Sequence, residues 1–86
     1  MLSFNLVFID RSTIWRLNKK YRQVDRPTTV LTFYYGMDGV GPVGEILICP
    51  AEAKKQKISI ERLIVHGLNN LLSEVPTAER QRAGFS

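Results

Sequence analysis

The stretch TTVLTFYYGMDGVGPVGEILIC, residues 28–49, is the part of the sequence that decides the fold. Residues 28–35 are almost entirely β-branched or aromatic, a composition typical of a β-strand. Residues 36–42 contain three glycines and a proline, which predicts a turn or loop. Residues 43–49 return to an apolar, β-branched pattern. The stretch therefore predicts two consecutive strands of a sheet.

One strand and one helix are predicted before this stretch. Residues 2–10, LSFNLVFID, form an apolar run whose length and aromatic content favour a buried strand over a helix. Residues 11–22, RSTIWRLNKKYR, are predicted to be helical, because apolar residues recur at helical spacing and Ser12 or Thr13 can cap the helix. Pro27 lacks a backbone donor and is expected to end this segment.

Two helices are predicted after the stretch. Pro50 separates the preceding strand from a short polar helix, AEAKKQK, at residues 51–57. Ser59 can cap a longer helix that Pro76 limits. The apolar stripe of that helix consists of Ile60, Leu63, Ile64, Gly67 and Leu71. We expect residues 77–86 to form a polar tail that frays.

The order of these elements, β-α-β-β-α-α, predicts an α+β fold in which helices pack on a small mixed β-sheet. The length of 86 residues suits one domain, residues 1–86. No apolar run approaches the roughly 20 residues that span a bilayer, and residues 1–10 lack a signal-peptide pattern. Cys49, the single cysteine, excludes an internal disulfide and is predicted to be a core residue. We expect a cytoplasmic location, with an organelle left open, and no membrane partner.

Positive charge is concentrated in one segment. The chain has 12 lysine and arginine residues against 8 acids, a formal net charge of +4. Residues 11–26 contain a single acid, Asp25, together with Arg11, Arg16, Lys19, Lys20, Arg22 and Arg26. Clustered positive charge is expected of a protein that binds a polyanion, and a solvated helix face is the structural alternative.

Three blocks of the sequence together resemble the YbeY-type rRNA-maturation endoribonucleases. The first, LNKKYRQVDRPTTVLTF at residues 17–33, is similar to the family pattern L-N-x-x-Y-R-x-x-D-x-P-T-D-V-L-S-F, with Thr29 and Thr32 in place of the usual Asp and Ser. The second, GEILICPAEAKKQ at residues 44–56, is similar to the family's G-D-I-x-I strand and the helix after it. The third, VHGLNNLLSEVP at residues 65–76, stands where the family carries H-G-x-x-H-L-x-G-x-D-H. The resemblance covers nearly the whole chain.

The resemblance implies a YbeY-like fold and a function in the maturation of ribosomal RNA. In such proteins three histidines hold a zinc ion, and a water at its open position is activated to attack a phosphodiester. Family members also carry an additional N-terminal helix and strand and a longer C-terminal helix, so this chain is expected to be a shortened version with a smaller sheet. The implied partner is ribosomal RNA or the small ribosomal subunit, with a ribosomal protein or an assembly GTPase as further partners.

The metal motif that the resemblance implies is incomplete in this chain. His66 stands at the first ligand position, whereas Asn70 and Pro76 occupy the other two. Proline offers no ligand atom and an amide oxygen is a poor zinc ligand, so we expect zinc to be absent or weakly bound and hydrolytic activity to be weak or lost. An oxygen-rich site that includes Glu74 is one alternative. An imidazole at the helix rim without any ligand role is the structural interpretation of His66.

Arg22 is the residue that the resemblance most favours as functional. The corresponding arginine of the family faces the cleft beside the metal and takes part in RNA handling, and a planar guanidinium suits a phosphate. The structural alternative is an ion pair with Asp25. The residues that we predict to bind RNA are Arg22, Lys19, Lys20, Arg16 and Arg26. The alternative functions are an active metal-dependent RNA hydrolase with a non-standard site and a protein-interaction module in ribosome assembly.

Overall fold

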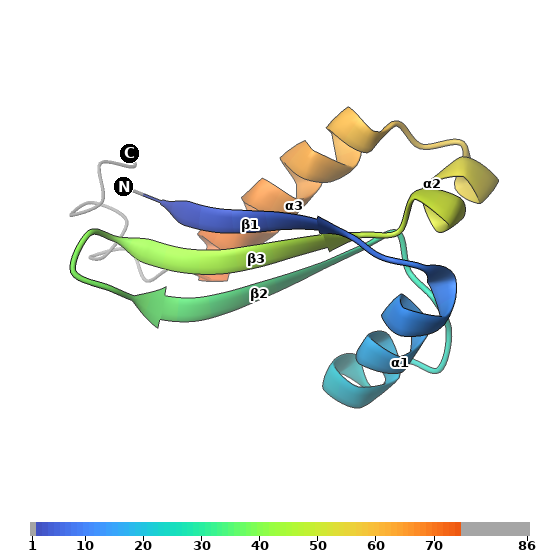
Figure 1. The fold of residues 1–86 in the computed structure, drawn as a ribbon, viewed down its shortest axis with the longest axis horizontal. Helices are drawn as coiled ribbons and strands as arrows, with labels where there is room; N and C mark the ends of the chain where they lie inside the picture. Colours follow the sequence, from blue (N-terminus) through green and yellow to red (C-terminus); the bar gives the residue numbers. More distant parts are fainter. Residues whose placement is uncertain (1, 75–86) are drawn as a thin grey trace.

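The computed structural model describes residues 2–74. Six elements follow one another along the chain (Figure 1): β1 (Ser3–Phe8), α1 (Arg11–Arg22), β2 (Val30–Met37), β3 (Pro42–Ile48), α2 (Pro50–Gln56) and α3 (Ile60–Glu74). The predicted order and the predicted α+β class are confirmed. The predicted helix limit at Pro76 and the predicted tail at residues 77–86 lie outside the described residues.

The three strands form one mixed sheet in the order β1-β3-β2. β1 runs parallel to β3, whereas β2 and β3 form an antiparallel hairpin. Asp38 closes the hairpin, because its backbone N–H donates to the Gly41 carbonyl at 2.9 Å and its carboxylate accepts the N–H groups of Val40 and Gly41. The register shifts between Tyr34 and Gly36, and Gly36 takes a φ of 96° that residues with a side chain rarely adopt.

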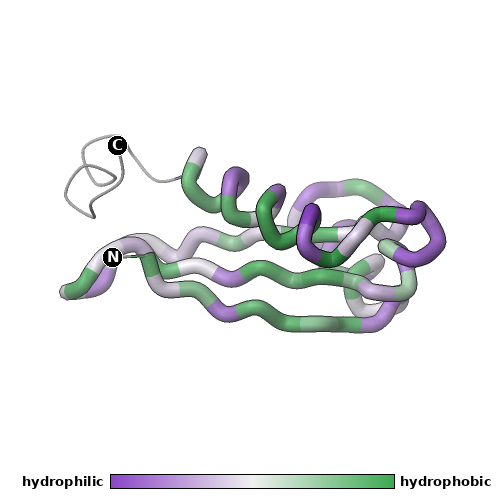
Figure 2. Tube along the Cα trace, turned by 90° about the horizontal axis from the view of Figure 1, so that it is seen from above, coloured by the Kyte–Doolittle hydropathy of each residue, from purple (hydrophilic) through white to green (hydrophobic). Residues whose placement is uncertain are grey.

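Helices pack on both faces of the sheet. α3 lies across β2 and β3 on one face, where Ile46 and Ile48 are fully buried (Figures 1 and 2). On the opposite face, Ile14 of α1 joins Leu47 and Cys49 in a second cluster, which confirms Cys49 as a core residue. Neighbouring strand residues belong to different clusters because successive side chains point to opposite faces. Within residues 2–74, no helix is both long enough and apolar enough to cross a bilayer.

Two glycines allow α3 to lie close to β3. A Cβ atom at Gly67 of α3 would stand 2.7 Å from the Cγ2 atom of Ile46, and one at Gly44 of β3 would meet the side chain of Leu71. A larger residue at either position would require a shift of the facing side chain, Ile46 or Leu71, or of the backbone. Close packing therefore explains why a glycine, Gly67, stands in the predicted apolar stripe. The same packing fixes the distance between α3 and the sheet.

The prediction that the first strand is buried is wrong. β1 is an edge strand, and its Phe4, Leu6 and Phe8 side chains are 39%, 36% and 54% exposed. These residues pair with Gly44, Ile46 and Ile48, so they belong to the face on which α3 packs. α3 covers β2 and β3 instead of β1, which leaves the apolar stripe of β1 uncovered within the described residues.

The helix caps agree with the prediction for α3 and correct it for α1. The Ser59 hydroxyl accepts the Arg62 N–H at 3.2 Å, as predicted. α1 is capped by Asp10, whose carboxylate accepts the Thr13 N–H at 2.8 Å, and not by Ser12 or Thr13. The prediction placed the cap too late because the apolar run before the helix includes Asp10.

Candidate nucleic-acid interface

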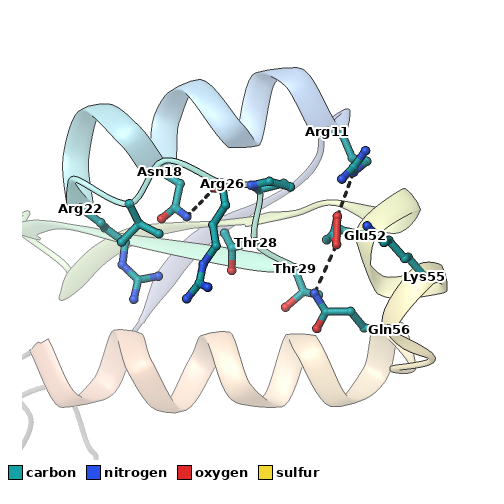
Figure 3. A pocket seen from close by; sticks show the side chains of 11 residues that line it. Arg11, Asn18, Arg22, Arg26, Thr28, Thr29, Glu52, Lys55 and Gln56 are labelled. Carbon is teal, nitrogen blue, oxygen red and sulfur yellow. Dashed lines mark hydrogen bonds and ion pairs between the residues drawn. The ribbon is translucent and has the colours of Figure 1, made fainter.

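A polar cleft opens where α1, the loop that follows it and α2 meet at one end of the sheet (Figures 1 and 3). Its volume is about 560 Å³. It is lined by Arg11, Asn18, Arg22, Val24, Arg26, Pro27, Thr28, Thr29, Glu52, Lys55 and Gln56. Four of these residues are basic and one is acidic, so we call this site the basic cleft.

Arg22 and Arg26 supply the exposed charge of the basic cleft. Arg22 is the last residue of α1, and Arg26 lies in the loop before Pro27. Both residues are exposed, and neither has an ion-pair partner among residues 2–74. Figure 3 shows both guanidinium groups extending from the α1 side of the cleft toward α3. Two like charges directed into one space repel each other, so an anion bound between them is stabilised.

Glu52 neutralises Arg11 at the opposite wall. Its carboxylate is buried in the first turn of α2, where it accepts from Arg11 Nε at 2.8 Å and from Gln56 Nε2 at 3.2 Å (Figure 3). The hydrogen bond from Arg11 lowers the pKa of Glu52 below its ordinary value, and the carboxylate is therefore ionised at neutral pH. The pair joins α1 to α2 and leaves Lys55 as the remaining cation of this wall.

Asn18 holds the loop that carries Arg26. Its side chain is 2% exposed, and its Nδ2 atom donates to the Arg26 carbonyl at 2.8 Å. A carbonyl only accepts, so this bond determines which way the amide is oriented. The Oδ1 atom is buried and has no hydrogen-bond partner among residues 2–74.

A second pocket, of about 540 Å³, lies on the other side of Arg22. Its lining includes Arg22, Tyr21 and Thr32 from one side and Asn70 and Glu74 of α3 from the other. The Thr32 hydroxyl is also buried without a hydrogen-bond partner within the described part of the chain. Arg22 thus lines both pockets, and the lining residues of each include one with a buried polar atom that has no hydrogen-bond partner among residues 2–74.

The structure separates the five residues that we predicted to bind RNA. Arg22 and Arg26 both line the basic cleft. Arg16 and Lys20 line a separate shallow groove along α1. Lys19 lines none of these three pockets. The charge of the basic segment is therefore divided between the cleft and the exposed surface of α1.

The alternative in which Arg22 pairs with Asp25 is wrong. The Asp25 carboxylate accepts from Trp15 Nε1 at 2.8 Å and lies 3.8 Å from Lys19 Nζ, in an exposed position. α1 ends in the left-handed conformation of Gln23, with a φ of 56°. The chain reverses there, so Asp25 returns along α1 while Arg22 faces the cleft.

His66 lies apart from the basic cleft. It is exposed on α3 and lines a shallow hollow with Glu61, Arg62, Val65 and Asn69. Asn70, the second position of the motif, lines the pocket beside Arg22 instead, together with Glu74. Pro76, the third position, lies outside the described residues.

The residues around His66 do not fit a zinc ion. His66 and Glu61 are the two side chains of this hollow that could coordinate zinc, beside the amide of Asn69 and the cationic side chain of Arg62, and two such ligands do not make a zinc site. Among residues 2–74, no three histidine, cysteine or acidic side chains lie close enough together to hold a metal. The alternative oxygen-rich site is also divided, because Glu74 and His66 line different pockets.

The wall of the basic cleft that α2 forms was not predicted from the sequence, and it consists of Glu52, Lys55 and Gln56. All three lie on α2, which was predicted only as a short polar helix. Arg11 was placed in the basic segment but was not predicted to bind RNA. The sequence did contain one indication that Glu52 has a special role, since it is the single acid of a helix with two lysines and lies within the first turn of that helix. Its partner Arg11, however, is 41 positions away.

The fold and the cleft together define a small α+β domain with a candidate polyanion-binding site. The family model described as Endoribonuclease YbeY matches residues 1–73. The chain therefore belongs to the YbeY endoribonuclease family, as the resemblance implied.

Several curated proteins named Endoribonuclease YbeY are similar to this chain. The protein of Cupriavidus metallidurans is 43% identical over 70 residues, which cover 71% of this chain and 36% of that protein. The Neorickettsia sennetsu protein is 32% identical over 88 positions, which cover 91% of this chain and 62% of that protein. The Oceanobacillus iheyensis protein is 38% identical over 84 positions, which cover 76% of this chain and 54% of that protein. The chain thus spans between about a third and three fifths of the length of these relatives.

Proposed function

We propose that this chain binds ribosomal RNA, or a pre-ribosomal particle, through the basic cleft during maturation of the small subunit. The observation that carries the proposal is the pair of exposed guanidinium groups, Arg22 and Arg26, directed into one cleft without an ion-pair partner among residues 2–74. Membership of a family named for an endoribonuclease supports RNA as the polyanion. The cytoplasmic location predicted from the sequence is part of this proposal.

The cleft is suited to phosphate groups for a physical reason. A guanidinium presents N–H donors in a planar fork that matches two phosphate oxygens. The carboxylate of Glu52 is already bonded to Arg11 and Gln56, so it repels an incoming phosphate less than a free carboxylate would. Tyr21, which is 53% exposed beside Arg22, offers an aromatic face on which an unpaired base can stack.

We further propose that phosphodiester hydrolysis by this chain is weak or lost. The proposal rests on the donor set: His66 is the single histidine, and the motif places Asn70 and Pro76 where the family has histidines. Without three such ligands a zinc ion has no stable site from which to activate water. The role that we assign to the chain is therefore recognition of RNA.

The binding proposal is tested by fluorescence anisotropy with a labelled hairpin of ribosomal RNA over a range of salt concentrations. Arg22, Arg26 and Lys55 are the three cations of the cleft without an ion-pair partner among residues 2–74. They predict that the logarithm of the observed association constant falls with the logarithm of the salt concentration, with a slope of about −2 to −3. Arg22→Gln and Arg26→Gln are each expected to weaken binding about tenfold and to reduce the slope by about one.

Lys55→Gln and Lys54→Gln provide a matched pair for the same assay. Both lysines lie on α2 and are exposed, but only Lys55 lines the cleft. Lys55→Gln should weaken binding and Lys54→Gln should leave it nearly unchanged. A slope near zero, or equal effects of the two variants, would show that the cleft is not the RNA site.

A further inference from the structure

Asn18 presents an acceptor to which none of residues 2–74 donates a hydrogen bond. Its Nδ2 atom donates to the Arg26 carbonyl, so the Oδ1 atom is directed away from that bond, and in the view of Figure 3 the amide lies above the guanidinium groups of Arg22 and Arg26. Asn18 is only 2% exposed and lines the basic cleft, and no group among residues 2–74 donates a hydrogen bond to its Oδ1 atom. Buried polar atoms without a partner are rare in folded proteins, so each one calls for a physical explanation.

The chemistry of the cleft indicates what kind of group would complete this acceptor. Phosphate oxygens are acceptors, and they therefore suit Arg22 and Arg26 but not Asn18 Oδ1. The missing group must be a hydrogen-bond donor that lies next to a phosphate. In RNA, the ribose 2′-hydroxyl lies beside the 3′-phosphodiester and can donate a hydrogen bond, whereas DNA has no such group.

We propose that Asn18 is a specificity-determining residue that accepts a hydrogen bond from a ribose 2′-hydroxyl while Arg22 and Arg26 hold the neighbouring phosphate. This inference rests on the proposed RNA-binding function of the same cleft. It adds a reason for RNA to be preferred over DNA, which positive charge alone does not provide because both polymers carry the same phosphates.

Access to Asn18 depends on the side chains around it. The Oδ1 atom is covered in the free protein, whereas Arg22 and Arg26 are exposed and have flexible side chains. The proposal requires that Oδ1 becomes accessible from the cleft when the guanidinium groups of Arg22 and Arg26 bind a phosphate. The loop backbone does not need to move, because the bond from Nδ2 to the Arg26 carbonyl is kept.

The decisive experiment changes the nucleic acid and leaves the protein intact. Binding of the wild-type chain is measured for one single-stranded sequence from ribosomal RNA prepared in three forms: all 2′-hydroxyl, all 2′-fluoro and all 2′-deoxy. The fluoro sugar keeps an RNA-like conformation and the same phosphate charge but cannot donate a hydrogen bond. We expect the 2′-fluoro form to bind about tenfold more weakly than the 2′-hydroxyl form, which is the effect of leaving one buried acceptor unpaired.

Two substitutions locate this preference at Asn18. Asn18→Asp keeps an acceptor oxygen but loses the donor to the Arg26 carbonyl, so overall affinity should fall while the ratio between the 2′-hydroxyl and 2′-fluoro affinities remains large. Asn18→Leu has a similar size but no polar atom, so its ratio should fall to about one. If Asn18→Leu does not fold, the wild-type comparison and the Asp variant still decide the question.

The outcomes separate this inference from the proposed function. Equal binding of the 2′-hydroxyl and 2′-fluoro forms by the wild-type chain would overturn the role of Asn18 and leave RNA binding intact. Failure to bind any of the three forms at low salt would overturn the proposed function itself. A ratio that survives in Asn18→Leu would assign the preference to another residue and would also overturn the inference.

Discussion

Glu52 illustrates how one residue determines the properties of the cleft. A buried carboxylate without partners would be strongly unfavourable, but Glu52 accepts hydrogen bonds from both Arg11 and Gln56. The carboxylate thereby joins the start of α1 to α2 and keeps Arg11 from adding a third unpaired guanidinium to the cleft. A residue that does not contact the proposed ligand thus controls the charge that the ligand meets.

Glu52 should make the stability of the protein depend on pH in the acid range. Its pKa in the folded protein lies below the ordinary value of 4.5, with the hydrogen bond from Arg11 as the main cause. The carboxylate of the folded state is therefore stabilising above pH 4.5, and this contribution is lost as the pH falls through the lowered pKa. Glu52→Gln should lower the urea midpoint at pH 7 and should make the decline below pH 4.5 shallower.

Urea midpoints of both proteins between pH 7 and pH 3 test this expectation. Some decline remains in the variant, because the pKa values of Asp10 and Asp38 are also lowered, mainly by hydrogen bonds from Thr13 and Val40 respectively. Parallel pH curves for the two proteins would contradict the role assigned to Glu52.

The contact between α3 and β3 is the feature that matters most at the scale of elements. Gly67 and Gly44 remove the side chains that would keep the helix and the strand apart. The close contact buries Leu63 and Leu71 of α3 against the sheet. It also sets the distance between α3 and the end of α1, and hence the width of the pocket that Arg22 shares with Asn70.

Gly67→Ala should destabilise the fold although alanine is the better helix former. The new methyl group would lie 2.7 Å from Ile46 Cγ2, and overpacking of this kind costs about 1–3 kcal/mol. The higher helix propensity of alanine returns about 1 kcal/mol. We therefore expect a net loss of about 1 kcal/mol in the free energy of unfolding, measured by urea denaturation.

Gly39→Ala serves as the control for this substitution. Apart from its own chain neighbours, no described residue has an atom within 4 Å of a Cβ placed at Gly39, so the free energy of unfolding should change by less than about 0.5 kcal/mol. If Gly67→Ala proved as stable as the wild type, or more stable, the packing role of Gly67 would be rejected.

In the whole molecule, the candidate RNA site and the histidine of the metal motif are in different places. The basic cleft lies where α1 and α2 meet at one end of the sheet (Figure 1), whereas His66 is exposed on α3 and lines a separate hollow. Of His66 and Asn70, the two ligand positions of the motif that lie within residues 2–74, Asn70 shares a pocket with Arg22 and His66 does not. RNA binding and metal binding can therefore be tested independently.

The zinc content of the purified protein tests the proposal that hydrolysis is weak or lost. We expect protein purified without added metal, and then dialysed against zinc, to retain well below one zinc ion per chain by elemental analysis, because one imidazole does not provide a zinc site. His66→Ala should change neither the metal content nor the RNA affinity. Stoichiometric zinc that is lost in His66→Ala would instead support the alternative of an active hydrolase with a non-standard site.

Much of the fold was predictable because its signals are local. The β-branched and aromatic run at residues 28–35 predicted β2, the glycines after it predicted the hairpin turn, and the apolar stripe through Leu63 and Gly67 predicted the buried face of α3. The burial of β1 was predicted wrongly, because an apolar strand can lie at the centre or at the edge of a sheet. Which of the two occurs depends on the path of α3, and residues 2–10 carry no information about that path.

The candidate site was predictable only in part. The resemblance indicated Arg22 and the basic segment included Arg26, and the structure places both in one cleft. The basic segment did not reveal that Lys19 pairs with Asp25 while Arg16 and Lys20 lie elsewhere. The side of α1 that each residue occupies relative to the cleft is set by the packing of Ile14 on the sheet.

The sequence alone determined the order of the elements, the family and the incomplete set of metal ligands, because periodicity, turn chemistry and motif spacing act between residues that are near each other in the chain. The tertiary structure alone shows that Glu52 meets Arg11 across 41 positions and that Asn18 lines one cleft with Arg22 and Arg26, with an Oδ1 atom that has no hydrogen-bond partner among residues 2–74. Such contacts depend on how the sheet brings α1 and α2 together, and that arrangement is a property of the packed molecule.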